Sequence, residues 1–217
     1  MKNELRIFLI RHGETIDNTK ENYERRIPDH LVPLTDAGVE QARETGVKLA
    51  AYCEREGIDL RRARIWRSPF LRTRRTSELF NESLGIADVR EEVTLIEQQY
   101  GLFDARRKEE LAAKFPEEYA EYRRQIESGG RLYARLPLGE SPLDVAVRLR
   151  PFIDDIRRDY ERGEADTLFI FTHGTAMRAF LLRYCNYSPE WYQAEYTPAN
   201  CAVRLLVGDE DRGYLNF

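Results

Sequence analysis

Two short apolar segments, far apart in the chain, end in the same way. Residues 5–10 run into an Arg-His-Gly sequence that begins at Arg11, and residues 167–172 run into a His-Gly pair at His173. Each apolar run has the length of one buried strand, and so has a third run at residues 63–66. Segments with helical spacing of apolar residues separate them. This alternation predicts a three-layer α/β/α fold, in which a mostly parallel central sheet carries helices on both faces.

Capping residues and helix breakers divide the rest of the chain into elements. The Ser-Pro pair at Ser68 predicts a helix that begins there and ends by Gly85. Pro151 lies inside a later helical pattern and predicts a kink. The other expected elements are helices after Thr35, over residues 108–128 with a break around Pro116, after Ser141 and after Gly174, and strands at residues 93–96 and 201–207.

Composition narrows the range of partners. The net charge of −4 disfavours binding to nucleic acid or to an anionic membrane, and no apolar run is long enough for a signal or a membrane span. Three cysteines without a C-x-x-C pair predict reduced thiols and a cytoplasmic location. Arginine makes up 29 of the 34 basic residues, which suits an anion site but also fits a lineage bias.

The chemistry is carried by histidines at the strand ends. The carboxyl ends of parallel strands share one edge, so His12 and His173 are expected to reach the same crevice. Arg11 supplies a permanent positive charge, and Gly174 allows close approach of a ligand to the backbone N–H groups of the following helix. This arrangement favours in-line attack of an imidazole on phosphorus, with a neutral nucleophile, a second imidazole that is preferably protonated when phosphate binds, and a separate acid for the leaving oxygen.

The sequence around these histidines resembles the histidine phosphatase superfamily, which includes cofactor-dependent phosphoglycerate mutases and many phosphatases. The resemblance extends over roughly residues 5–185 and rests on five ordered motifs. They are Arg11-His12-Gly13-Glu14-Thr15 with Asn18, Pro33-Leu34-Thr35 with Gly38, Ser68-Pro69-Phe70-Leu71-Arg72-Thr73, Leu95-Ile96-Glu97-Gln98-Gln99-Tyr100-Gly101 and His173-Gly174 with Arg178. A further stretch, Gly139-Glu140-Ser141 with Asp144 and Arg148, is also similar to the family.

The resemblance implies a role for each matching residue. His12 is the implied nucleophile, and Glu97 is the implied proton donor and later the base, with Glu91 or Glu92 as alternatives. The implied phosphate pocket consists of Arg11, Arg72 and His173. The implied substrate contacts are Asn18, Tyr100, Gly174 and Thr175. His30 lies in a loop that could fold over the crevice. Two roles are open for it: contacting or gating the substrate, or making a contact within the loop alone.

The sequence shows no internal repeat, low-complexity tract or Gly/Ser linker, so a single domain over residues 1–217 is expected, with a loop and helical subregion at about residues 100–139 over the active site. No metal or cofactor is expected, and the partner is a small phosphorylated metabolite. The oligomeric state stays open, a homodimer being one alternative. Ser141 is expected to cap a helix, and the basic cluster at residues 106–108 to be solvated or to meet an anionic substrate tail.

Three rival functions differ in their sequence requirements. A zinc hydrolase would need closely spaced histidines, which the chain lacks, and a non-catalytic phospholigand-binding module would not need both His12 and Glu97. A phosphoglycerate mutase would usually carry asparagine where this chain has Thr175, and tryptophan where it has Ile16. The long insertion typical of mutases is also missing before Gly139. The sequence therefore favours a phosphatase.

Overall fold

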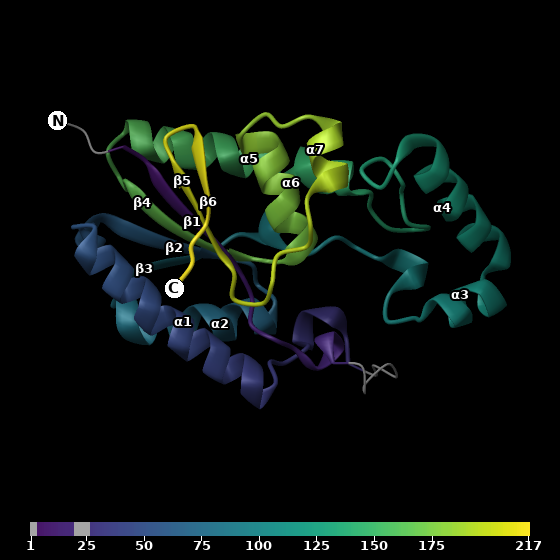
Figure 1. Ribbon diagram of the computed structural model, residues 1–217, viewed down its shortest axis with the longest axis horizontal. Helices are drawn as coiled ribbons and strands as arrows, with labels where there is room; N and C mark the ends of the chain where they lie inside the picture. Colours follow the sequence, from purple (N-terminus) through teal and green to yellow (C-terminus); the bar gives the residue numbers. More distant parts are fainter. Residues whose placement is uncertain (1–3, 20–26) are drawn as a thin grey trace.

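The fold is organised around one six-stranded sheet (Figure 1). A computed structural model describes residues 4–19 and 27–217. The strands are β1 (Arg6–Arg11), β2 (Ala63–Arg67), β3 (Asp88–Glu91), β4 (Thr167–Thr172), β5 (Val203–Val207) and β6 (Glu210–Tyr214). Their order is β3-β2-β4-β1-β5-β6, with parallel pairing from β3 to β1 and antiparallel pairing of β5 with β1 and with β6. The expectation of a mostly parallel sheet is confirmed.

Helices cover both faces of this sheet. The α-helices in the described part of the chain are α1 (Asp36–Arg55), α2 (Leu71–Leu84), α3 (Lys108–Lys114), α4 (Pro116–Gly129), α5 (Pro142–Glu161), α6 (Gly174–Tyr184) and α7 (Pro189–Ala194). Helices α1 and α2 pack together on one face, and α5 and α6 on the other (Figure 1). Helices α3 and α4 lie beyond the sheet to one side (Figure 1). The three-layer α/β/α expectation is confirmed.

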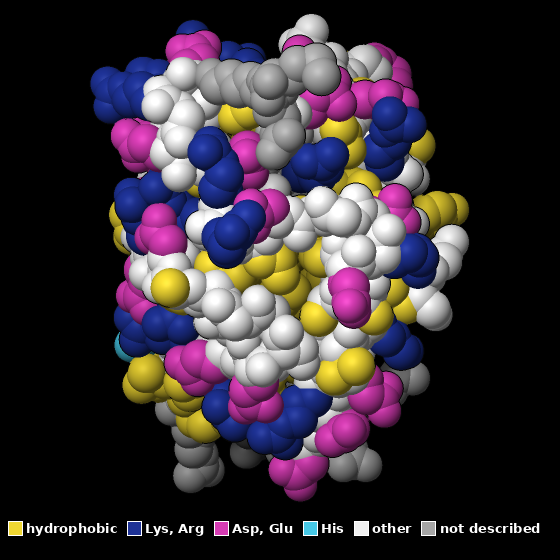
Figure 2. All heavy atoms as spheres, turned by 90° about the vertical axis from the view of Figure 1, so that its left-hand side faces the viewer, with side chains coloured by type: hydrophobic (Ala, Val, Ile, Leu, Met, Phe, Trp, Pro, Cys, Tyr) yellow, Lys and Arg dark blue, Asp and Glu magenta, His cyan; other side chains and the backbone are white. Residues whose placement is uncertain are grey.

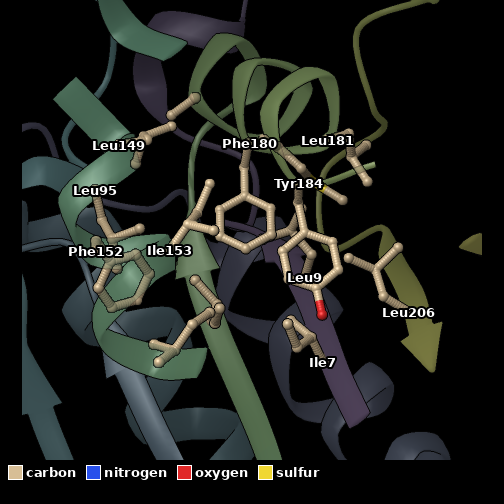
Figure 3. Close-up of a cluster of buried hydrophobic side chains, with 14 of the residues drawn as sticks. Ile7, Leu9, Leu95, Leu149, Phe152, Ile153, Phe180, Leu181, Tyr184 and Leu206 are labelled. Carbon is tan, nitrogen blue, oxygen red and sulfur yellow. The ribbon is translucent and has the colours of Figure 1, made fainter. Parts of the chain in front are cut away.

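Alternate residues of the buried strands supply two cores. Ile7 and Leu9 of β1 belong to the cluster shared with α5 and α6, where Figure 3 shows them below the ring of Phe180. Phe8 and Ile10 point to the opposite cluster, shared with α1 and α2. All four β1 side chains are completely buried. Burial of both faces explains why the strand has a continuous apolar run instead of alternation.

Several element boundaries follow the expected local rules. Thr35 caps α1 by accepting the N–H of Gly38, and Ser141 forms a capping box with Asp144 at the start of α5. Gly85 ends α2 in the left-handed conformation, with φ of 67°. The polar helical region is divided at Pro116, as expected.

Three sequence-based assignments are wrong or incomplete. Helix α2 begins at Leu71, with Phe70 as its N-cap, so Ser68 does not cap it. Residues 93–95 form a short 3-10 turn, and the third strand lies earlier, at Asp88–Glu91. The strand β6 and the short helix α7 were not predicted, because β6 is a polar edge strand without an apolar pattern and α7 has only 6 residues.

The side on which the N-terminus lies carries a balanced distribution of charge. Figure 2 shows this face, over which basic and acidic side chains are interspersed. Near it, at the beginning of β2, the buried guanidinium of Arg64 forms ion pairs with Asp88 (2.6 Å) and Asp159 (2.5 Å). A buried cation requires such partners. Arg64 is therefore part of the scaffold.

Within the described part of the chain, no helix combines the length and the apolar character that crossing a membrane requires. All three cysteines, Cys53, Cys185 and Cys201, carry free thiols. Burial raises the pKa of Cys53 and Cys201 to about 12, so both thiols stay protonated at neutral pH.

Candidate active site

The two strand-end histidines meet at one edge of the sheet. The parallel pairing of β1 with β4 aligns Arg11 with Thr172, so His12 and His173 occupy equivalent positions. Their rings lie edge to face, with centroids 5.2 Å apart. The exposed fraction is 4% for His12 and 0% for His173. The predicted juxtaposition of the two imidazoles is thus present in the structure.

The hydrogen bond of His12 determines its tautomer. Nδ1 lies 2.8 Å from the carbonyl oxygen of Gly13, which can only accept, so Nδ1 carries the proton. The remaining nitrogen, Nε2, keeps its lone pair. Burial, reinforced by the positive charges of Arg72 and Arg11, holds the pKa of His12 well below its ordinary value. His12 is therefore a neutral imidazole with an available nucleophilic nitrogen at neutral pH.

The second histidine is held between Arg72 and Ser68. Arg72 donates its Nε–H to Nδ1 of His173 over 3.2 Å, and arginine cannot accept, so Nδ1 carries no proton. Nε2 of His173 then carries the proton and donates it to the Ser68 hydroxyl, 2.8 Å away. Burial, followed by the charge of Arg72, holds the pKa of His173 well below its ordinary value. These contacts favour neutral His173, whereas a protonated ring was expected with phosphate bound.

Arg11 has a buried donor for which the described residues offer no acceptor. Its Nη1 donates to the carbonyl oxygen of Pro198 over 2.6 Å. Its Nε is buried and has no acceptor among residues 4–19 and 27–217. Buried N–H donors almost always have an acceptor, so an orphaned one at a cavity wall marks a place for an oxygen of a ligand. A cationic donor of this kind suits an oxyanion.

Glu97 sits against the N-terminus of α6. Its Oε1 accepts the N–H groups of Gln98 (2.9 Å) and Ala176 (3.1 Å), and its Oε2 accepts the N–H of Thr175 (3.1 Å). A carboxylate oxygen has two lone pairs, so Oε2 keeps one for a proton. Both Oε2 and the Nε of Arg11 lie within 4 Å of the position that a Cβ on Gly174 would occupy. Gly174 thus leaves space beside both groups.

A clamp from α5 fixes the loop that carries Glu97. Arg148 donates Nη2 to the carbonyl oxygens of Ile96 (2.8 Å) and Glu97 (3.1 Å), and Nη1 to that of Thr94. Glu140 pairs with Nε of Arg148 (2.8 Å). The sequence stretch around Glu140 and Arg148 therefore serves to position the Glu97 loop.

Asn18 is held at the rim by its side-chain oxygen. Oδ1 accepts the backbone N–H of Thr15 (3.1 Å) and the Nδ2 group of Asn200 (3.0 Å). Asn200 Nδ2 also donates to the carbonyl oxygen of His12 over 3.2 Å. Within the described chain, no residue accepts from Nδ2 of Asn18. These amide hydrogens therefore remain for a ligand.

One cavity of about 320 Å³ joins these groups. Its lining contains six of the expected site residues, Arg11, His12, Asn18, Arg72, Glu97 and Tyr100. Residues 103–106, which follow Tyr100, complete one side. The region at residues 100–139 thus contributes to the cavity wall through its first residues.

The remaining candidates lie around this cavity. The side chain of Thr175 lies beside the hydroxyl of Tyr100, while its N–H binds Glu97. His30 is exposed and lies near Phe70, with ring centroids 6.5 Å apart, and it is not among the residues that line the cavity. Of the basic cluster, Arg106 lines the cavity, and its Nη1 donates to the carbonyl oxygen of Leu102.

Sequence reasoning missed four residues that shape the site. Ser68 was assigned to a helix cap, yet its hydroxyl binds His173. Asn200 and Pro198 bind the His12 and Arg11 segment from a loop 187 or more residues away. Asp29 binds Arg72, with Oδ1 of Asp29 3.0 Å from Nη1 of Arg72. Of these four residues, only Asp29 was indicated by the sequence, because it belongs to an unusual Pro-Asp-His sequence in its loop.

The described residues include no cluster of three or more His, Cys, Asp or Glu side chains that could hold a metal ion. The positive charge at the cavity comes from arginines instead. Arg11 and Arg72 line the cavity together with His12, and after burial their charges lower the pKa of this ring.

Comparison with known proteins agrees with this fold and with these motifs. A family model described as the histidine phosphatase superfamily (branch 1) matches residues 7–217. The chain belongs to the histidine phosphatase superfamily.

Relatives and solved structures include both mutase-like proteins and phosphatases. Phosphoglycerate mutase-like protein AT74 of Arabidopsis thaliana is 30% identical over 93% of this chain, which spans only 64% of that protein's length. A 2,3-bisphosphoglycerate-dependent phosphoglycerate mutase of Azorhizobium caulinodans is 33% identical, over 85% of this chain and 83% of its own length. The alpha-ribazole phosphatase from Shigella flexneri has a similar fold, with a TM-score of 0.72 and 21% identity over 93% of this chain and 89% of that chain.

Proposed function

We propose that this protein is a metal-independent phosphatase that hydrolyses small phosphomonoesters through a phosphohistidine on His12. The observation that carries the proposal is the hydrogen bond from Nδ1 of His12 to the carbonyl of Gly13, because it leaves Nε2 as a neutral nucleophile. The orphaned Nε–H of Arg11 at the same cavity supports an oxyanion as the ligand.

In the proposed first step, Nε2 of His12 attacks phosphorus in line with the ester oxygen. The N–P bond forms as the P–O bond breaks, and the leaving oxygen takes a proton from Oε2 of Glu97. In the second step, water gives a proton to Glu97 and attacks phosphorus, and the N–P bond breaks. Phosphate leaves, and the lone pair returns to Nε2 of His12.

The proposed binding groups neutralise the non-bridging oxygens. Phosphoryl transfer depends mainly on positioning and on stabilising this charge. Arg11 and Arg72 would supply the positive charge, the amide of Asn18 would donate hydrogen bonds, and neutral His173 would hold Arg72 in place through Nδ1, without a cofactor. Tyr100 would contact the alcohol part of the ester. We further propose that residues 1–217 work as one domain.

A phosphoglycerate mutase is the second candidate, because the relative from Azorhizobium caulinodans is named as one. Two residues favour the phosphatase. Thr175 stands where mutases usually carry asparagine, and here its side chain lies beside Tyr100 while its N–H binds Glu97. Ile16 stands where they usually carry tryptophan.

The test begins with an aryl phosphate in excess chelator. We expect the unchanged protein to continue hydrolysis and to form an acid-labile phosphoenzyme that rapid quenching can trap. The His12→Ala protein should show neither hydrolysis nor the phosphoenzyme. Chelator-sensitive turnover, or a fully active His12→Ala protein, would refute the mechanism. Incubation with 3-phosphoglycerate and 2,3-bisphosphoglycerate should release inorganic phosphate, and isomerisation without release would favour the mutase.

A further inference from the structure

The cavity contains an acidic residue that the proposed reaction does not use. Asp29 belongs to a short 3-10 turn, Asp29–Leu31, and its side chain meets the guanidinium of Arg72. Nη1 of Arg72 donates to Oδ1 of Asp29 over 3.0 Å, and Nη2 donates to Oδ2 over 3.4 Å. The carboxylate thus lies across both terminal nitrogens of the guanidinium.

This contact involves Arg72, the cation that binds the substrate phosphate in the proposed function. Nε of Arg72 is already bound to Nδ1 of His173, so Nη1 and Nη2 are the nitrogens with which Arg72 would hold a ligand. Arginine binds carboxylate and phosphate oxygens through the same pair of N–H groups. Asp29 and a substrate phosphate therefore require the same donors in the same cavity.

The pairing is partly shielded from water. The Arg72 side chain is 6% exposed and that of Asp29 28% exposed. Electrostatic interactions weaken less at such positions than on an open surface, so a second anion beside Asp29 is disfavoured.

We propose that Asp29 is a specificity-determining residue, an internal anion that competes with the substrate phosphate for Arg72. The competition weakens the binding of phosphate itself and, most strongly, of esters that carry a second anionic group beside the phosphate. The preferred substrates are then phosphomonoesters of alcohols without such a group. This inference rests on the proposed function, in which Arg72 binds the phosphate.

A substitution can remove the negative charge of Asp29 without removing its backbone contact with Arg72. The carbonyl oxygen of Asp29 also accepts Nη1 of Arg72, over 2.7 Å, and the turn packs against α2. Asp29→Asn removes the negative charge and leaves this backbone contact in place. A matched control is Asp154→Asn on α5, which removes one charge from a side chain that is 51% exposed and lies outside the cavity.

The first experiment is a calorimetric titration with inorganic phosphate, which needs no turnover. We expect Asp29→Asn to bind phosphate at least about fivefold more tightly than the unchanged protein, because like charges are costly in one site. Asp154→Asn should bind as the unchanged protein does. Equal or weaker binding by Asp29→Asn would overturn the proposal, and so would the absence of phosphate binding in all three proteins.

The second experiment compares two esters that differ in one charge, glycerol 3-phosphate and 3-phosphoglycerate. The unchanged protein should have the higher kcat/KM for glycerol 3-phosphate, and Asp29→Asn should reduce this preference by at least about fivefold. An unaltered preference would contradict the role of Asp29 while leaving the phosphatase intact. Failure to hydrolyse any ester would count against the proposed function, and the phosphate titration would still decide on Asp29.

Discussion

The Nε–H of Arg72 donates to Nδ1 of His173 over 3.2 Å, and this contact fixes where the ring of His173 holds its proton. Protonation of Nδ1 would place two donors face to face. The same guanidinium also lowers the pKa of His12. Burial, reinforced by this one arginine, therefore keeps both histidines neutral in the folded protein.

Neutral, buried histidines make the stability of the protein depend on pH. Both rings have a lowered pKa when folded, whereas an unfolded histidine has a pKa of about 6.5. Below about pH 6.5 the unfolded chain binds protons that the folded chain does not. The free energy of unfolding should therefore be unaffected by these rings above about pH 7 and fall with decreasing pH, by up to about 1.4 kcal/mol per pH unit for each ring.

Urea unfolding at pH 7.5, 6.5 and 5.5 measures this dependence. Replacing one ring, in His12→Asn, should remove about half of the part of the slope that the two histidines contribute. An identical slope with and without His12 would show that its ring is not held neutral by the fold.

Glu97→Gln should separate the role of the acid from that of the nucleophile. Oε2 of Glu97 is the oxygen with a lone pair left for a proton, and an amide cannot donate it to the leaving oxygen in the same way. We expect kcat/KM for alkyl phosphates to fall about 100-fold or more, and kcat/KM for an aryl phosphate with a good leaving group to fall far less. Steady-state kinetics on a matched pair of esters tests this, and equal losses would point to another acid.

Arg148 should act on the same step without touching the substrate. It does not line the cavity, but it binds the carbonyl oxygens of Ile96 and Glu97. Arg148→Met should lower kcat for alkyl phosphates by about tenfold or more while KM changes little, since displacement of a positioned acid is costly. Arg148→Lys, which restores the charge, should recover part of the loss. A change in KM alone would contradict a positioning role.

Gly13→Ala should destabilise the fold at the site. A Cβ on Gly13 would lie 2.6 Å from the carbonyl oxygen of Gly38, so the first turn of α1 would have to move. We expect a loss of about 1–3 kcal/mol in the free energy of unfolding. A suitable control is Gly129→Ala, whose Cβ would meet only ordinary contacts. Comparable melting curves for the two variants would show that α1 tolerates the displacement.

The sequence predicted the elements that depend on local patterns. The pairing of His12 with His173 was accessible because both follow apolar strands and adjacent parallel strands end at one edge. Thr35 and Ser141 were accessible because capping is a matter of a few neighbouring residues.

Contacts between distant segments escaped the same reasoning. Serine is a common helix-capping residue, so Ser68 was expected to cap a helix. Only the position of β4 shows that its hydroxyl binds His173. Asn200 and Pro198 lie in an irregular loop whose return to the His12 segment depends on the antiparallel strand β5. A strand such as β6 was missed because a polar edge strand lacks an apolar pattern.

The position of β1 between β4 and β5 determines when the site can form during synthesis of the protein. A ribosome releases the N-terminal segment first, yet the neighbours of β1 on both sides come from residues 167–172 and 203–207. His12 therefore emerges long before the strands that enclose it. Such distant pairing slows folding and leaves apolar surface uncovered in the nascent chain. The chain must be synthesised as far as β5 before His12 acquires its pocket.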